Sequence, residues 1–181
     1  MPTFVALLRG INVGKTRRIP MEGLRGMLAE CGYGEVATLL NSGNVVFGAA
    51  RGAAKDIAAK ISAAIAGRFE IEVPVIVKTA KELQAIVAEN PFASAVVDHS
   101  KLLVAFAQDS KALTSLLPIG KLVVAPEGFA IGKNAAYLYC ARGILKSSAG
   151  VALLGKVGKG ATSRNWGTVL KLNVLANERA A

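Results

Sequence analysis

Two short segments of this chain are apolar on both sides of an extended backbone. Residues 3–9 read TFVALLR, so Val5 and Leu7 face opposite to the other apolar side chains, and residues 102–107 read LLVAFA. A strand that is apolar on both faces needs both faces of its sheet covered. We therefore expect these strands to lie in sheets that are buried on both sides, either by two subdomains packed together or by a dimer.

The first half of the chain predicts the order strand, helix, strand, strand, helix, strand. Pro20 and Glu22 favour a helix start, Ser42-Gly43 separates two apolar runs as a hairpin turn does, and Pro74 places the last strand at a sheet edge. The predicted elements are residues 3–9, 21–31, 36–41, 44–48, 55–68 and 73–78. This order is that of the ferredoxin-like βαββαβ unit.

The second half echoes this order without repeating the sequence. A capping box formed by Thr79 and Glu82 predicts a helix over 80–89, and residues 92–100 read as a linker. The elements predicted after the linker are residues 102–107, 110–117, 121–125, 129–131, 136–140, 147–157 and 165–176. We expect this half to be a second, modified plait.

The composition fits two small domains with well-buried cores. The chain has 181 residues, of which 52% are hydrophobic and 19% charged, and this length suits one large domain or two small ones. We therefore predict an α+β protein of two ferredoxin-like (α-β plait) subdomains packed together. The predicted divisions are an N-terminal βαββαβ plait over 1–79, a connecting helix and linker over 80–100, and a modified plait with terminal helices over 101–181.

Basic side chains gather in two stretches that contain no acid. Residues 1–21 hold four lysines and arginines and residues 128–177 hold seven, in a chain of formal net charge +10. Such segregation of charge in a folded domain indicates a site for an anionic partner. Phosphate-bearing small molecules and nucleic acids both fit this description.

The segment GINVGKT, at residues 10–16, follows the first expected strand. A Walker A loop has four residues between its glycines and runs directly into a helix, whereas this segment has three and the helix starts later, so it does not match. A glycine-containing loop still exposes amide donors, and Arg9, Asn12 and Lys15 could contact the same anion. The alternative is that the glycines serve backbone turns, Asn12 caps the loop and the cations face water.

Two further motifs carry polar residues. Residues 41–44, NSGN, have the composition of a hairpin turn, and alternatively supply polar contacts to a ligand beside the first loop. Thr162 or Ser163 is expected to cap the last helix, which would leave Arg164 near the helix N-terminus, where the macrodipole disfavours a cation without an anionic partner. Trp166 is either a core residue or a stacking surface.

Several classes of site lack their residues in this sequence. His99 is the only histidine, and Cys31 and Cys140 have no metal-ligand spacing, so we predict no metal site and reduced thiols in a cytoplasmic protein. The chain has no apolar run of about 18 residues and no basic start of a signal peptide, so we expect no membrane association. No paired carboxylates or nucleophile motif identify an enzyme, and that question stays open.

Three motifs, LLRGINVGK, NSGNVVF and ATSRNWGTVLKL, together resemble a bacterial family known as domain of unknown function 1697, over nearly the whole chain. The resemblance implies an α+β fold of two ferredoxin-like plait subdomains, and no established activity, cofactor or substrate. Lys15 stands where the family commonly has a second glycine, and Ser163 and Gly167 are further departures. The candidate ligand-binding residues are Arg9, Gly10, Asn12, Gly14, Lys15, Ser42, Gly43, Asn44, Thr162, Arg164, Asn165 and Trp166.

The sequence therefore gives three functional hypotheses. The first is a protein that binds an anionic, phosphate-bearing small molecule through basic loops, with Arg9 and Arg164 at one pocket. The second is a nucleic-acid-binding protein, although the RNP1 pattern that many RNA-binding plaits carry is missing. The third is a transferase or hydrolase that acts on an anionic substrate. The cofactor is left unknown, and both a monomer and a dimer fit the sequence.

Overall fold

The computed structural model describes residues 1–180 and divides the chain into two compact units. Unit 1 comprises Met1–Leu83 with Leu172–Ala181, and unit 2 comprises Gln84–Lys171. This division differs from the predicted boundaries after residues 79 and 100, because two helices, α3 (Ala80–Glu89) and α6 (Trp166–Ala180), each contribute residues to both units.

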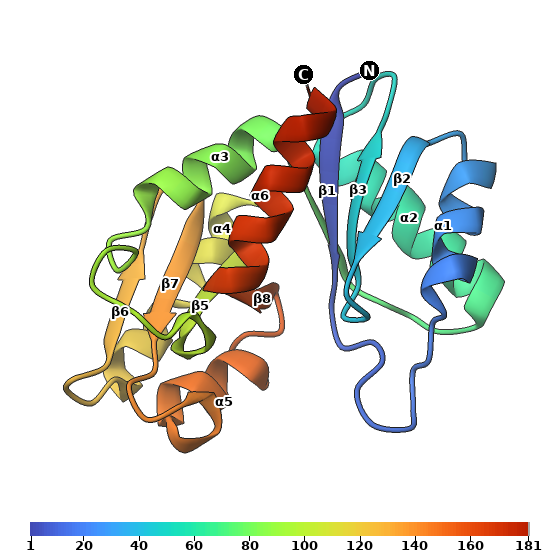
Figure 1. Ribbon diagram of the computed structural model, residues 1–181. Coiled ribbons are helices and arrows are strands. Elements are labelled where there is room, and N and C mark those ends of the chain that lie inside the picture. Colours follow the sequence, from blue (N-terminus) through green and yellow to red (C-terminus); the bar gives the residue numbers. More distant parts are fainter. Residues whose placement is uncertain (181) are drawn as a thin grey trace. The chain divides into compact units, whose positions relative to one another are not determined.

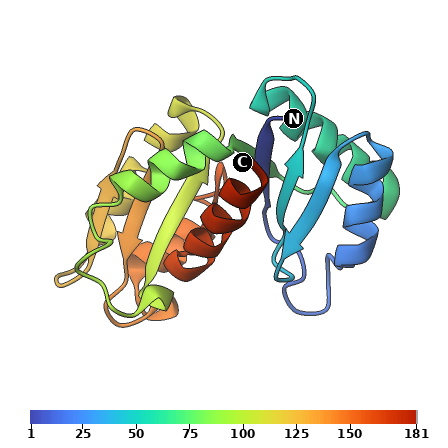
Figure 2. The same cartoon turned by 45° about the horizontal axis from the view of Figure 1, so that its top comes forward.

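Unit 1 is an antiparallel four-stranded sheet with two helices on one face (Figures 1 and 2). The sheet order is β2-β3-β1-β4, which is the order of a ferredoxin-like plait. Phe4 and Phe47 of the sheet and Ile61 of α2 belong to the core on the helix side. The elements are β1 (Thr3–Leu8), α1 (Met21–Glu30), β2 (Gly34–Leu39), β3 (Asn44–Gly48), α2 (Ala54–Phe69) and β4 (Val75–Thr79).

The central strand β1 is buried along its whole length. Val5 and Leu7, which point away from the helix side, are 0% exposed, so the expected burial of both faces is confirmed. Part of α6 belongs to this unit, since the Thr3 hydroxyl donates to the Arg179 carbonyl at 3.2 Å and the Arg179 guanidinium donates to the Glu35 carbonyl. Two strands of unit 1, β1 with Thr3 and β2 with Glu35, thus bond to a residue near the other end of the chain.

Two local sequence patterns, Pro74 and the Thr79–Glu82 capping box, have the structural roles that were predicted for them. Pro74 directly precedes β4, which lies at a sheet edge as predicted. The capping box at the start of α3 also forms: the Glu82 carboxylate accepts from the Thr79 amide at 2.8 Å, and the Glu82 amide donates to the Thr79 hydroxyl at 3.1 Å.

Unit 2 repeats the plait with a sheet of order β6-β7-β5-β8. Leu103 of β5, Leu113 of α4 and Leu153 of α5 belong to one core cluster. Both units are therefore plait-like, and the predicted α+β class is confirmed. The elements are β5 (Leu102–Ala107), α4 (Ser110–Thr114), β6 (Gly128–Ile131), β7 (Ala135–Tyr139), α5 (Ser148–Leu154) and β8 (Ala161–Asn165), with short 3-10 helices at His99–Lys101, Leu117–Leu122 and Ile144–Lys146.

The strand predicted over 121–125 is wrong. Leu117–Leu122 forms a 3-10 helix with proline in its first turn, a position that suits the fixed φ of that residue. Ile119 is fully buried and anchors the turn, whereas Val124 is 71% exposed. Residues 121–125 therefore do not form a strand, despite their β-branched side chains.

Within residues 1–180, no helix combines the length and the apolar character that crossing a membrane requires.

Candidate functional site

The loop between β1 and α1 is closed by the side chain of Asn12. Its Nδ2 donates to the carbonyls of Ile19 at 2.9 Å and Asn41 at 2.7 Å, and its Oδ1 accepts from the Ile19 amide at 2.9 Å. These bonds use both donors and the acceptor of the amide group. Asn12 therefore holds the loop in place, which is the alternative role that the sequence left open for it.

Asn12→Ala is expected to lower the free energy of unfolding of unit 1 by about 1 to 3 kcal/mol, because it leaves the Ile19 amide and two carbonyls without their partner. Chemical denaturation measures the loss, and hydrogen exchange at Ile19 should become faster. Thr16→Ala, at an exposed position of the same loop, is the control and should change neither quantity. Unchanged exchange at Ile19 would contradict this role of Asn12.

The other loop residues of the first motif serve the backbone or face water. Gly10 and Gly14 have φ of 68° and 65°, in the left-handed region that glycine adopts at low cost. Lys15 is exposed between them and the helix. The structure gives Gly10 one further role, because its carbonyl accepts from Nε of Arg17 at 3.0 Å.

The second motif lies directly against the first. The Leu8 amide donates to the Gly43 carbonyl at 2.9 Å, and Asn12 binds the Asn41 carbonyl. Nδ2 of Asn44, which is buried, donates to the Leu39 carbonyl and to the Ser42 hydroxyl, both at 2.9 Å. The structure thus brings the first two motifs together, and their asparagine side chains mostly bind backbone groups of the two loops.

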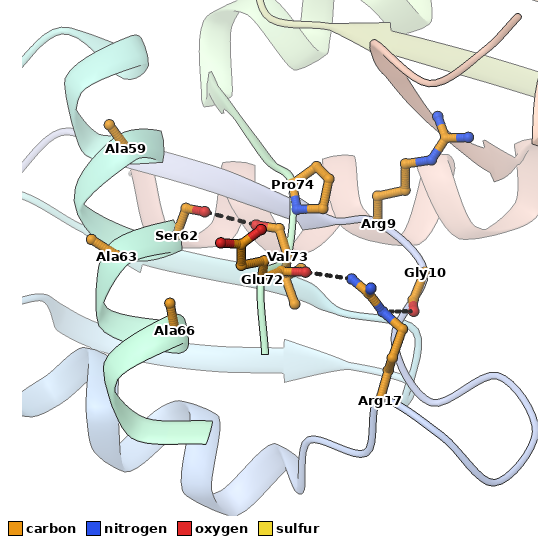
Figure 3. A pocket seen from close by; sticks show the side chains of 10 residues that line it. All are labelled: Arg9, Gly10, Arg17, Ala59, Ser62, Ala63, Ala66, Glu72, Val73 and Pro74. Carbon is orange, nitrogen blue, oxygen red and sulfur yellow. Dashed lines mark hydrogen bonds between the residues drawn. The ribbon is translucent and has the colours of Figure 1, made fainter. Parts of the chain in front are cut away.

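A cavity of about 970 Å³ lies at the base of the first loop in unit 1 (Figure 3). We call it the loop pocket. One side is α2, where the wall consists of small side chains, and the other side is the loop and the segment that leads into β4. The lining residues are Arg9, Gly10, Arg17, Ala59, Ser62, Ala63, Ala66, Glu72, Val73 and Pro74.

Arg17 is held in the loop pocket by backbone carbonyls. Its Nε donates to the Gly10 carbonyl at 3.0 Å and its Nη2 to the Glu72 carbonyl at 2.6 Å. These bonds use two of the five N–H groups of a guanidinium. Within residues 1–180, no carboxylate lies at ion-pair distance from Arg17. The side chain is therefore fixed in position while its positive charge is not neutralised.

Arg9 lines the same pocket from the end of β1. Its amide donates to the Pro74 carbonyl at 3.0 Å, which ties this end of the strand to the segment before β4. Burial lowers the pKa of the Arg9 guanidinium. In Figure 3 its side chain points away from that of Arg17, so the two cations are not stacked on each other.

The pocket also contains polar groups that the sequence did not single out. The Ser62 hydroxyl, on α2, donates to the Val73 carbonyl at 2.8 Å. Glu72 contributes its exposed carboxylate, and Arg17 is one of the four basic residues in the acid-free segment 1–21. The only signal in the sequence was the charge of Arg17, since small residues on a helix face and a single glutamate are common on ordinary surfaces.

The third motif requires a correction. Thr162 and Arg164 lie in β8, so neither Thr162 nor Ser163 caps the last helix, and Arg164 is not in the first turn of that helix. The cap is Asn165, whose Oδ1 accepts from the Thr168 amide at 2.9 Å. Polar residues that are buried in a strand, such as Thr162 and Arg164, resemble helix-cap residues in the sequence.

Arg164 is a buried cation in unit 2. It is 9% exposed, and its Nη1 donates to the Thr162 hydroxyl and to the Ser163 carbonyl, both at 2.8 Å. Burial lowers the pKa of Arg164 to about 10. Trp166 is 3% exposed and belongs to the core, so the stacking role is not available to it.

Neither thiol forms a disulfide: Cys31 is exposed and Cys140 is buried. Burial raises the pKa of Cys140, which disfavours the reactive thiolate. Among residues 1–180, the structure contains no group of three or more His, Cys, Asp and Glu side chains that could hold a metal ion.

Comparisons with known proteins agree with this architecture. The model of a family described as "Protein of unknown function (DUF1697)" matches residues 1–137, which include the first two motifs and the loop pocket and end before the third motif. The chain is also similar to a solved structure of the conserved bacterial protein SP0830 from Streptococcus pneumoniae. The TM-score is 0.81 and the identity 21%, with 97% of this chain and 98% of that chain covered, which shows a shared fold. No curated protein matches the chain.

Proposed function

The chain belongs to the family described as a protein of unknown function (DUF1697), and since that description assigns no activity, we propose from the geometry that unit 1 binds a phosphate-bearing small molecule in the loop pocket. The observation that carries the proposal is the guanidinium of Arg17, which two backbone carbonyls hold at a cavity of about 970 Å³. Volumes of about 300 to 1,000 Å³ are typical of ligand sites.

The way in which Arg17 is held supports an anionic ligand. Carbonyl oxygens orient a guanidinium but leave its net charge, so the remaining N–H groups can form charge-assisted bonds to phosphate oxygens. The side chain is also fixed before the ligand arrives, which reduces the entropy lost on binding. Arg9 adds a second positive charge to the lining of the same pocket.

Arg17→Gln is expected to weaken binding of pyrophosphate by about 10- to 100-fold, because charge-assisted hydrogen bonds contribute about 1.5 to 3 kcal/mol. Isothermal titration measures this effect, and native mass spectrometry of freshly purified protein checks for a co-purified anion. The matched control is Arg18→Gln, which removes the same charge from the same loop at a residue that lines a different cavity. The control should bind as the parent does.

The outcomes separate the proposal from its alternatives. Because Arg17 also orders the loop, Arg17→Lys is measured beside it: lysine keeps the charge without the planar fork and should bind with intermediate affinity. A parent protein that binds neither pyrophosphate nor any co-purified anion would sink the proposal. Equal, salt-dependent losses for an oligonucleotide in Arg17→Gln and Arg18→Gln would instead support the nucleic-acid hypothesis.

A further inference from the structure

We propose that the ligand of the loop pocket carries an amine beside its phosphate group, and that Glu72 and Ser62 bind this amine. The inference rests on the proposed function and narrows its ligand class. It follows from the arrangement of donors and acceptors around the pocket, which differ between the loop side and the α2 side.

The Glu72 carboxylate supplies the first acceptor. Its backbone carbonyl binds Arg17 at 2.6 Å, whereas the side chain is turned toward α2 and Ser62 (Figure 3). Within residues 1–180, this carboxylate has no hydrogen-bond or ion-pair partner. An unneutralised negative charge therefore lines the same pocket as the Arg17 cation, on the opposite side of the Glu72 peptide group.

The Ser62 hydroxyl supplies the second acceptor. Its only hydrogen is directed to the Val73 carbonyl at 2.8 Å, so the lone pairs of its oxygen are left to accept a bond from a ligand. The α2 side of the pocket thus offers two acceptors, a carboxylate and a hydroxyl oxygen, while the loop side offers the N–H donors of Arg17.

The separation of acceptors on the α2 side from donors on the loop side favours some anions over others. A ligand that carries only negative charge gains from Arg17 and is repelled by Glu72, whereas a ligand with an ammonium group at its other end gains from both. Room for the ligand between the two ends comes from the short side chains of Ala59, Ala63 and Ala66 on α2. The fitting class is a phosphorylated amine, in which both charges sit on one small molecule.

The test compares two ligands that differ in one group: O-phosphoethanolamine, which has the amine, and propyl phosphate, which has a methyl group in its place. Isothermal titration is expected to give about five- to tenfold tighter binding of the amine, as a charge-assisted bond at a partly exposed site allows. Glu72→Gln should remove this preference and leave propyl phosphate bound at least as tightly. Glu70→Gln, which changes a neighbouring carboxylate outside the pocket, should keep the preference.

Failure of the inference differs from failure of the proposed function. Equal affinity for the two ligands, or a preference that survives in Glu72→Gln, overturns the role of Glu72 while binding of both ligands remains sensitive to Arg17→Gln. Absence of binding for both ligands overturns the proposed function together with the inference. Loss of the preference for the amine in Glu70→Gln as well as in Glu72→Gln also overturns the inference. The preference would then depend on the total charge of the protein and not on Glu72.

Discussion

Glu89→Ala is expected to lower the free energy of unfolding of unit 2 by about 3 kcal/mol or more. Glu89 is the last residue of α3, and its carboxylate accepts from the amides of Lys133, Asn134 and Ala135 at 3.2, 2.9 and 3.2 Å. Nδ2 of Asn134 also donates to it at 3.1 Å, and the Tyr137 hydroxyl, which donates to the Ile86 carbonyl at 2.6 Å, lies 2.9 Å from it. Removing one side chain therefore strands several donors at once, and each stranded buried group costs about 1 to 3 kcal/mol.

Tyr137 lies beside this carboxylate and keeps its bond to the Ile86 carbonyl when Glu89 is removed, so the expected loss comes from the three amides and from Asn134. The Tyr137 side chain is fully buried, and burial together with the neighbouring Glu89 carboxylate raises the pKa of its hydroxyl far above the ordinary value. Urea denaturation followed by the fluorescence of Trp166, the only tryptophan, reports on unit 2. Glu178→Ala, which removes an exposed carboxylate in α6, is the control. A similar midpoint for both variants would mean that the Glu89 bonds add no net stability.

Gly43→Ala is expected to destabilise unit 1 by about 3 kcal/mol. Gly43 has φ of 84°, and a Cβ at this position would lie 2.6 Å from Cβ of Leu8 and 3.0 Å from Cδ1 of Ile11. The left-handed conformation costs alanine about 1 to 2 kcal/mol, and the overpacking adds about 1 to 3 kcal/mol. Leu8 ends the central strand β1, so it cannot move away without disturbing the sheet.

The control for Gly43→Ala is a second glycine-to-alanine variant that is expected to stabilise unit 1. Gly26→Ala places the same methyl group on α1 at an exposed position with no atom within 4 Å, and alanine should stabilise the helix there by about 0.5 to 1 kcal/mol. Thermal unfolding by circular dichroism measures both variants. Hydrogen exchange at Leu8, whose amide donates to the Gly43 carbonyl, should become faster only in Gly43→Ala. Equal melting temperatures would refute the packing argument.

The order of helices and strands in unit 1 could be predicted from local patterns, because each pattern has one main physical cause. In unit 2, strand β8 (Ala161–Asn165) was not among the predicted elements. The apolar runs within 3–9 and 102–107 predict central strands, Pro74 predicts an edge strand, and the Thr79–Glu82 capping box predicts a helix start. The failures came where tertiary contacts outweigh composition. The β-branched side chains of residues 121–125 predict a strand, although the buried anchor of that segment is Ile119 in a 3-10 turn.

The candidate site was only partly predictable. The charge pattern drew attention to the first loop, and the second motif does lie against it through Leu8 and Gly43. No pattern indicated that Arg17 would bond the carbonyl of Glu72, 55 residues away. Such a contact depends on where β4 begins relative to the loop. The register between β1 and β4 sets that position, and local sequence patterns do not reveal it. The roles of Asn12 and Asn44 were ambiguous because an asparagine that binds a ligand and one that closes a loop look identical in a sequence.

The division of α6 between the two units has a consequence for synthesis. Unit 2 is built from one continuous stretch, Gln84–Lys171, whereas unit 1 needs both Met1–Leu83 and Leu172–Ala181. On the ribosome, the whole chain of unit 2 emerges before the segment that binds Thr3 and Glu35. Unit 1 is therefore the last to complete its packing. A nascent chain stalled before residue 172 would present all four strands of the first sheet to chaperones without the α6 segment that bonds to Thr3 and Glu35.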